Sequence, residues 1–166
     1  MTRTDSERST NASSRATRWL DHDEEAAWRA IATVMITLPW VLECQLRRDA
    51  DLSLIEYYTL ARLSEDPDHT LRMSDLAVVT NASLSRLSHL VKRLESRGLV
   101  RREPDPGDGR FTNAILTRTG YSKLVASAPG HVATVRSVVI DEFSAPELRR
   151  LRESLERLAA RIEACG

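Results

Sequence analysis

The sequence predicts a mainly α-helical fold with one small β-hairpin. Apolar residues recur at helical spacing in several long segments of the 166-residue chain. Aromatic residues make up only 5% of the chain and glycines number six, a composition that fits helices better than a β-sandwich. A loop rich in turn residues, 104–110, separates two short β-like runs. We expect one integrated domain with a core of its own.

The first helix is expected to begin near Asp21 or Asp23, because either carboxylate can cap it. Apolar residues then follow at i, i+3, i+4 and i+7 as far as Leu42. Pro39 lies inside this pattern. Because proline removes one helical hydrogen bond and crowds the preceding turn, we expect a kink or a break there.

Two shorter helices and a turn are expected next. Ser53 starts the second helix, and the Asp-Pro-Asp run at 66–68 ends it. Ser74 is expected to cap a third helix through about Val79, and residues 80–83 form a tight polar turn.

A fourth helix and the hairpin follow directly. The helix is predicted over about 84–97, with Ser83 as its N-cap and Gly98 just beyond its end. Strands are predicted at 99–103 and 112–117, and the loop between them is long enough to project as a wing. This order of elements is typical of a winged helix-turn-helix.

The C-terminal part is predicted to be helical. A fifth helix is expected from Thr117 to about Phe143, interrupted near Pro129 and Gly130. A capping box from Ser144 starts the sixth helix. Its apolar residues either form a dimer seam or pack on the subunit's own core. They are spaced 3-4-3-4, at Leu148, Leu151, Leu155, Leu158 and Ile162.

The remaining composition excludes several classes of protein. The longest apolar stretch, 36–42, is far shorter than a membrane span, so no membrane partner is expected. The Ser/Thr/Arg-rich residues 1–18 lack an apolar core typical of secretory signals, and we expect a disordered tail or a basic arm that touches DNA. Cys44 and Cys165 are far apart and indicate reduced cytoplasmic thiols, with no metal site and no cofactor.

The net charge is zero, but the charge is unevenly distributed. Residues 19–69 hold 4 basic and 11 acidic side chains, whereas residues 70–118 hold 9 basic and 5 acidic side chains. A local basic patch attracts phosphate whatever the total charge. The middle of the chain is therefore the expected nucleic-acid surface.

The fourth helix has two distinct faces. Its apolar side should pack on the core through Leu84, Leu87, Leu90, Val91 and Leu94. The opposite side carries small hydroxyls and cations with no acid at its centre, while Glu95 lies on the core-ward edge. Such a face fits a major groove better than an ordinary solvated helix, which usually mixes both charges.

The side chains on this face suggest different roles. Arg86 can read guanine bidentately, whereas Lys92 and Arg93 are better placed for phosphates. In the wing, Arg110 can enter a minor groove, and Asp108 either orients that arginine or only caps the turn. The candidate DNA contacts are Ser74, Ser83, Ser85, Arg86, Ser88, His89, Lys92, Arg93, Arg101, Arg102, Asp108 and Arg110.

These motifs resemble the multiple-antibiotic-resistance regulator (MarR) family over about residues 22–164. The most specific matches are Asp108-Gly109-Arg110 and Leu116-Thr117-Arg118-Thr119-Gly120. Others are Met73-Ser74-Asp75-Leu76-Ala77, the run from Ser85 to Val100, and Arg101-Arg102-Glu103-Pro104. Gly109 departs from the acidic or basic residue common in the family, and Pro39 also departs from the pattern.

The resemblance implies a triangular homodimer on a pseudo-palindromic operator in double-stranded DNA. The dimer would join through the first, fifth and sixth helices, giving a dimerisation region at 19–50 and 119–164. The DNA-binding lobe would then be 51–118. The resemblance also implies release from DNA by a small aromatic effector or an oxidant in many members.

A cleft for such an effector can be proposed from the aromatic residues. The candidates are Trp28, Trp40, Tyr57 and Tyr58, with Arg62 or His22 as a polar partner. The alternative is that these aromatics belong to the core or to an interface. Cys44 is either a redox sensor or an inert buried thiol.

The sequence favours a transcription regulator, most simply a repressor, over two rivals. No catalytic motif such as HExxH, a serine elbow or a phosphate loop is present, so an enzyme is not expected. A winged-helix module for protein contacts would explain the fold but not the acid-poor face around Lys92.

Overall fold

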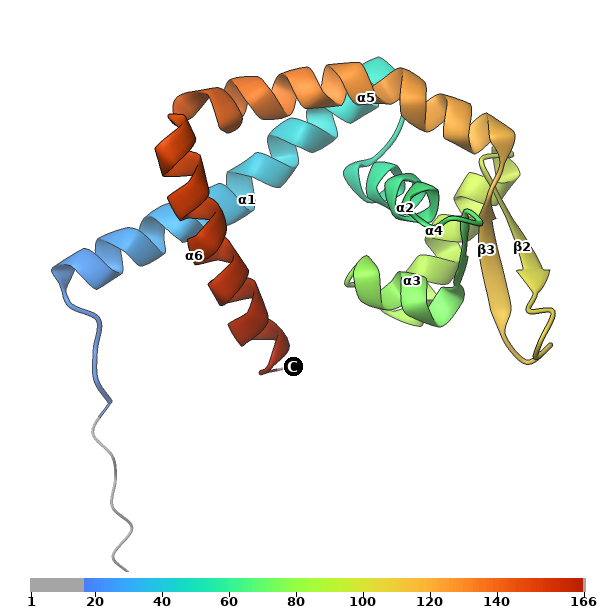
Figure 1. The fold of residues 1–166 in the computed structure, drawn as a ribbon, viewed down its shortest axis with the longest axis horizontal. Helices are drawn as coiled ribbons and strands as arrows, with labels where there is room; N and C mark the ends of the chain where they lie inside the picture. The colour runs from blue at the N-terminus through green and yellow to red at the C-terminus, as the bar shows by residue number, and fades with distance from the viewer. Residues whose placement is uncertain (1–16, 166) are drawn as a thin grey trace, which may run out of the picture. The chain divides into compact units, whose positions relative to one another are not determined.

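A computed structural model describes residues 17–165. It contains α1 (His22–Ala50), α2 (Leu54–Glu65), β1 (Thr70–Arg72), α3 (Met73–Val79), α4 (Leu84–Ser96), β2 (Val100–Pro104), β3 (Thr112–Leu116), α5 (Arg118–Val138), the 3₁₀ helix η1 (Ile140–Glu142) and α6 (Ala145–Glu163). The chain divides between Ile36 and Thr37, inside α1, into two units, which are described separately. The mainly helical winged helix-turn-helix prediction is confirmed (Figure 1).

In the first unit, the start of α1 is fixed by local polar contacts. The Asp21 carboxylate accepts from the Glu24 backbone N–H at 2.9 Å, and the Glu24 carboxylate accepts from the Asp21 N–H at 3.0 Å. Of the two predicted caps, Asp21 therefore makes the bonds. Arg18 pairs with Glu24 at 2.6 Å. Of the predicted disordered tail, residues 1–16 lie outside the described residues.

Helix α1 continues through Pro39, so the predicted break is wrong. One proline removes a single hydrogen bond, and the flanking turns keep theirs. With 29 residues and a mean hydropathy of 1.2 over its most apolar window, α1 is long and apolar enough to cross a membrane. One such helix is weak evidence for a membrane, because the core helix of a soluble protein and a signal sequence pass the same test.

In the second unit, the wing belongs to a three-stranded antiparallel sheet with the order β1-β3-β2. Strand β1 was not predicted, because three residues are too few to show an alternating pattern. It pairs Leu71 with Ala114 of β3, and β2 pairs Arg102 with the same residue from the other side. The hairpin is thus attached to the segment that leads into α3.

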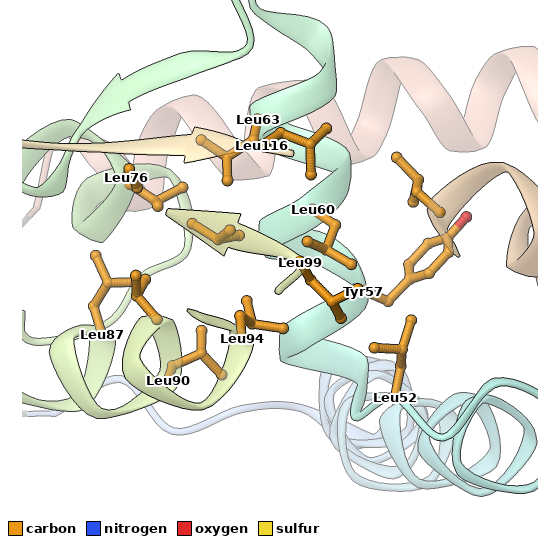
Figure 2. Close-up of a cluster of buried hydrophobic side chains, with 14 of the residues drawn as sticks. Leu52, Tyr57, Leu60, Leu63, Leu76, Leu87, Leu90, Leu94, Leu99 and Leu116 are labelled. Carbon is orange, nitrogen blue, oxygen red and sulfur yellow. The ribbon is translucent and has the colours of Figure 1, made fainter. Parts of the chain in front are cut away.

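The core of this unit lies between α2, α3, α4 and the sheet. Leucines from these elements point toward one another in Figure 2, and Leu60, Leu63, Leu76, Leu87 and Leu94 are fully buried. Helix α5 adds Leu124 to the same cluster. This packing fixes the angle of α4 on the lobe and leaves its opposite face in solvent.

Two helix boundaries differ from the predictions. Ser74 does not cap α3: the N-cap position is Arg72, and the Ser74 hydroxyl bonds to the Asp75 carboxylate at 3.0 Å. Because β1 runs directly into α3, the N-cap of α3 lies two residues earlier in the chain than predicted.

Helix α5 is continuous through Pro129, so the predicted interruption is also wrong. Gly130 lies against α1, where an added Cβ would be 3.2 Å from Nε2 of Gln45. Glycine permits this close approach of α5 to α1. The helix ends at Val138, before the predicted Phe143, and η1 leads to α6.

Candidate nucleic-acid interface

Helix α4 begins at a polar cap and presents a basic face. The Ser83 hydroxyl accepts from the Arg86 backbone N–H at 3.4 Å, and Asn81 in the preceding turn has a φ of 48°. The predicted outward residues Ser85, Arg86, Ser88, His89, Lys92, Arg93 and Ser96 are all exposed. The helix-turn-helix therefore offers these side chains together on one surface.

The inward face of α4 differs from the prediction at one position. Leu87, Leu90, Val91 and Leu94 are buried as expected, but Leu84 is 58% exposed. Leu84 is the first residue of the helix, where the core has already ended and the chain leaves the turn. It contributes an apolar surface beside the basic face.

The Glu95 carboxylate, on the edge of this face, is paired with the wing. Arg102 of β2 donates to the Glu95 carboxylate from Nε at 3.0 Å and from Nη2 at 2.6 Å. Its backbone N–H also bonds Glu95, at 3.1 Å. These bonds lower the pKa of Glu95, with the Arg102 side chain the largest favourable cause against a smaller opposing effect of burial. Arg102 therefore ties β2 to α4.

The C-terminal end of α4 is anchored to α2 through Glu56. The Glu56 side chain is only 4% exposed and accepts from the Ser53 backbone N–H within a capping box. It also pairs with Arg93 at 3.4 Å and with Arg97 at 3.7 Å. Arg93 remains 60% exposed, so its guanidinium reaches the surface as well.

The wing carries its arginine in a fixed orientation. Arg110 donates from Nε to both Asp108 oxygens, at 2.9 Å and 3.1 Å, and Nη2 donates at 2.5 Å. The pKa of Asp108 is lowered, chiefly by this side-chain bond to Arg110. Asp108 also accepts from the Arg110 backbone N–H at 3.1 Å, so the side-chain pair and the turn cap are both present, and the Arg110 side chain remains 85% exposed.

Asp105 organises the wing turn, and the sequence reasoning missed it. Its carboxylate accepts from the backbone N–H groups of Gly107 at 2.9 Å and Asp108 at 3.0 Å. It also accepts from Nε of Arg72 at 3.1 Å and Nδ2 of Asn113 at 3.3 Å. The backbone bond from Gly107 is the first cause of its lowered pKa. An aspartate two residues before Gly107 is the signal that could have identified this turn.

A groove lies between the wing and the helix-turn-helix and brings several candidates together. Among them, Ser74, Ser88, Arg102 and Arg110 face the same hollow. Ser83 lines a neighbouring hollow with Ser74. Arg101 lies outside both and pairs with Glu103 on its own strand. The groove is lined by Arg72, Met73, Ser74, Leu84, Ser88, Arg102, Arg110, Phe111 and Thr112.

The predicted effector residues are only partly brought together. Trp40 and Tyr58 line a shallow apolar hollow with Leu54 and Ile55. Tyr57 is buried, with its ring centroid 6.2 Å from that of Tyr58. Arg62 is exposed and pairs with Glu65 at 2.8 Å. Trp28 and His22 belong to the first unit and are exposed there.

His131 of α5 lies next to these aromatics and was not predicted. Its ring centroid is 4.4 Å from that of Tyr57 and 6.4 Å from that of Tyr58. Burial lowers the pKa of His131 and raises that of Tyr57. A lone histidine on a helix carries no sequence signal for this position.

The seam of α6 is uncovered within the described chain. Leu148 and Leu151 are half-buried, while Leu155, Leu158 and Ile162 are 53%, 42% and 63% exposed. The cysteines are free: Cys44 is half-buried and Cys165 exposed.

Comparison with known proteins identifies the chain's relatives. A sequence model of the MarR family matches residues 50–110. The MarR family transcriptional regulator Sco3205 from Streptomyces coelicolor, solved in complex with DNA, is 41% identical, with 87% of this chain and 91% of that chain covered and a TM-score of 0.83.

Two curated proteins give the same picture. Transcriptional regulator HosA of Escherichia coli O111:H- is 35% identical over 48% of this chain. The matched part spans only 57% of the length of HosA. The transcriptional repressor Rv2887 of Mycobacterium tuberculosis is 28% identical over 66% of this chain and 76% of its own length. The chain therefore belongs to the MarR family and is a DNA-binding transcription regulator, not an enzyme.

Proposed function

We propose that the protein is a repressor that binds a pseudo-palindromic operator as a homodimer. Helix α4 enters the major groove, and Arg110 of the wing enters the adjacent minor groove. The similarity to a regulator solved in complex with DNA and to a named repressor supports this function.

The observation that carries the proposal is the composition of the exposed α4 face. Arg86, His89 and Lys92 project from it among serines, and its neighbouring carboxylate Glu95 is already paired with Arg102. A duplex can approach such a surface without desolvating an unpaired acid. Serines allow close approach, and the arginine and lysine supply base and phosphate contacts.

The uncovered apolar side chains support a homodimer. None of the described residues of α6 is buried, although its apolar positions keep a coiled-coil spacing. Exposed apolar surface of this extent marks an interaction site. Two copies joined through these helices would place two α4 helices about one helical turn of DNA, roughly 10 bp, apart.

An effector site near Trp40 and Tyr58 is the regulatory part of the proposal. The hollow that these residues line is almost entirely apolar, with Glu43 as its charged member. A small aromatic ligand stacked there would contact α1 and α2 of the DNA-binding unit.

Fluorescence anisotropy tests the proposal with the purified protein and DNA from upstream of its own gene. A scrambled duplex of equal length and composition is the control. The proposal predicts tight preference for the upstream DNA that weakens steeply with salt, because several phosphates are neutralised. Equal weak binding to both duplexes contradicts autoregulation, and no binding at low salt favours the alternative of a protein-interaction module.

Peroxide separates the redox alternative from the ligand-controlled repressor. If Cys44 is a sensor, peroxide lowers operator affinity of the wild-type protein but not of Cys44→Ser. If peroxide leaves the operator affinity of both proteins unchanged, the hypothesis that Cys44 is a redox sensor is rejected.

A further inference from the structure

The groove between the wing and α3 contains an arginine that the proposed DNA contacts leave out. Arg72 is the last residue of β1 and the N-cap position of α3, so its backbone is fixed by both elements. Its guanidinium carbon lies 4.7 Å from the centre of the Phe111 ring, and its Nε donates to Asp105 at 3.1 Å. Both partners belong to the wing.

The partners of Arg72 stand on either side of the wing's tip. Asp105 closes the turn by accepting from the N–H groups of Gly107 and Asp108, and Asp108 in turn holds Arg110. Phe111 directly follows Arg110. One side chain from the helix-turn-helix therefore contacts both ends of the segment that carries Arg110.

Two other contacts hold the hairpin below its tip: Arg102, in the middle of β2, pairs with Glu95, and β1 pairs with β3 as far as Asn113. A hairpin held only below its tip can still swing at the tip, whereas a further contact with the tip segment restrains it. The Arg72 side chain is 45% exposed and the Asp105 side chain 12% exposed. The Asp105 carboxylate is therefore less exposed to solvent than the carboxylates of the wing's other ion pairs, Glu103, Glu95 and Asp108. The flat guanidinium over the Phe111 ring adds a cation–π attraction to this ion pair.

We propose that Arg72 is a positioning residue for DNA recognition: by clamping Asp105 and Phe111 it holds Arg110 at the angle required for the minor groove. This inference rests on the proposed function, since it deepens the role of the wing. Preorganisation of this kind raises affinity by reducing the ordering that binding would otherwise require.

The free protein gives the first test, by amide hydrogen exchange in the full chain. Arg72→Ala should speed exchange at the Gly107 and Asp108 amides, which bond to Asp105, and leave the α4 amides unchanged. Arg136→Ala is the matched control, because this exposed arginine of α5 pairs only with Asp141. Unchanged exchange in the wing of Arg72→Ala would overturn the clamp.

A double-mutant cycle with Arg110→Ala gives the second test, by anisotropy on the operator. Arg72→Ala should weaken binding roughly five- to tenfold, the lower range for a DNA-contacting arginine. In the Arg110→Ala background it should change affinity less than about twofold, because there is no longer an arginine to position. Equal losses in both backgrounds would overturn the proposal and make Arg72 a phosphate contact of its own.

Arg72→Lys separates position from charge. It keeps the positive charge but loses the flat group over Phe111 and the Nε–H that bonds Asp105. The clamp predicts that it behaves like Arg72→Ala, and wild-type affinity would contradict it. If the wild-type protein itself shows no operator preference, the proposed function fails, and exchange in the wing alone decides whether Arg72 holds it.

Discussion

Single residues divide the proposed interface into base-reading and phosphate-binding parts. Arg86 lies in the first turn of α4, nearest the end that enters a groove, whereas Lys92 lies six residues, or about 1.7 turns, further along. Base contacts carry sequence information, and phosphate contacts supply affinity that is independent of sequence. Substitutions at these two positions should therefore differ in kind.

Arg86→Ala is expected to cost about 1–3 kcal/mol of operator binding and to relax one base preference. Lys92→Ala should weaken all sequences alike and reduce the salt slope by about 1. Anisotropy titrations on the operator and on single-base variants measure both effects. Wild-type binding by both mutants would mean that α4 does not read the DNA.

His131 should make stability depend on pH. Its pKa is lowered from the ordinary 6.5 by burial, so the neutral ring stabilises the fold fully above that pH. This contribution is lost as the pH falls through the lowered pKa, because the unfolded chain then binds the proton more readily.

The measurement is urea unfolding at pH 7.5 and 5.5 for the wild type and for His131→Phe. Phenylalanine keeps a ring against Tyr57 but cannot titrate. The wild type should lose more free energy of unfolding over this interval than the variant. Equal losses would show that other groups cause the acid sensitivity.

At the junction of α5 with the hairpin, Gly120 has the least room for a side chain among the described glycines. A Cβ on Gly120 would lie 2.0 Å from the Leu99 carbonyl oxygen and 2.8 Å from Cδ1 of Leu116. The Thr117 hydroxyl caps α5 by accepting from the Gly120 N–H at 2.9 Å and also donates to the Gly98 carbonyl at 2.7 Å. The first turn of α5 is thereby fixed against Gly98 and Leu99, the residues that lead into β2.

Gly120→Ala should therefore destabilise the fold by roughly 1–3 kcal/mol or more, since backbone must move to admit the methyl group. Gly109→Ala is the control, because a Cβ there meets nothing within 4 Å. It should leave stability unchanged or raise it slightly. Thermal unfolding compares the two, and similar midpoints would contradict the close packing at Gly120.

The sequence predicts elements well where local chemistry decides them. Helix α4 follows from the Ser83 cap, the leucine stripe and Gly98, which has a φ of 68°. The Asp108–Arg110 pair is local as well. Strand β1 was missed because it depends on pairing with the distant β3. The continuity of α5 through Pro129 was missed because a proline removes only one helical hydrogen bond, which the flanking turns can tolerate.

The candidate site shows the same division. The exposed positions of α4 follow from its periodicity, but Leu84 was wrongly assigned to the core because a wheel does not show where the core ends. Asp105 and Arg72 are 33 residues apart, and nothing local indicates their contact. His131 is placed beside Tyr57 only by the packing of α5 on α2.

At the scale of the whole molecule, the excess of basic side chains and the exposed leucines of α6 lie on different parts of the chain. The net charge is zero, yet residues 70–118 carry an excess of basic side chains. The uncovered leucines lie on α6, outside this basic region. The molecule thus separates the surface proposed for DNA from the surface proposed for a second copy.

Leu158→Glu should disrupt the dimer, because it places a charge on the α6 seam. Ala160→Glu adds the same charge to the opposite, exposed face of the helix and should leave the dimer intact. Sedimentation velocity gives the mass of each. A monomeric wild-type protein, or a Leu158→Glu variant that is still a dimer, would contradict dimerisation through the apolar residues of α6.

Selection of bound duplexes from a random DNA pool tests whether a homodimer recognises one DNA sequence. A homodimer that reads DNA through α4 should enrich one motif of two inverted half-sites, with centres about 10 bp apart. Arg86→Ala should lose a base preference at matching positions of both halves. Enrichment of no motif, or of a single half-site with no inverted partner, would contradict sequence-specific recognition by a homodimer.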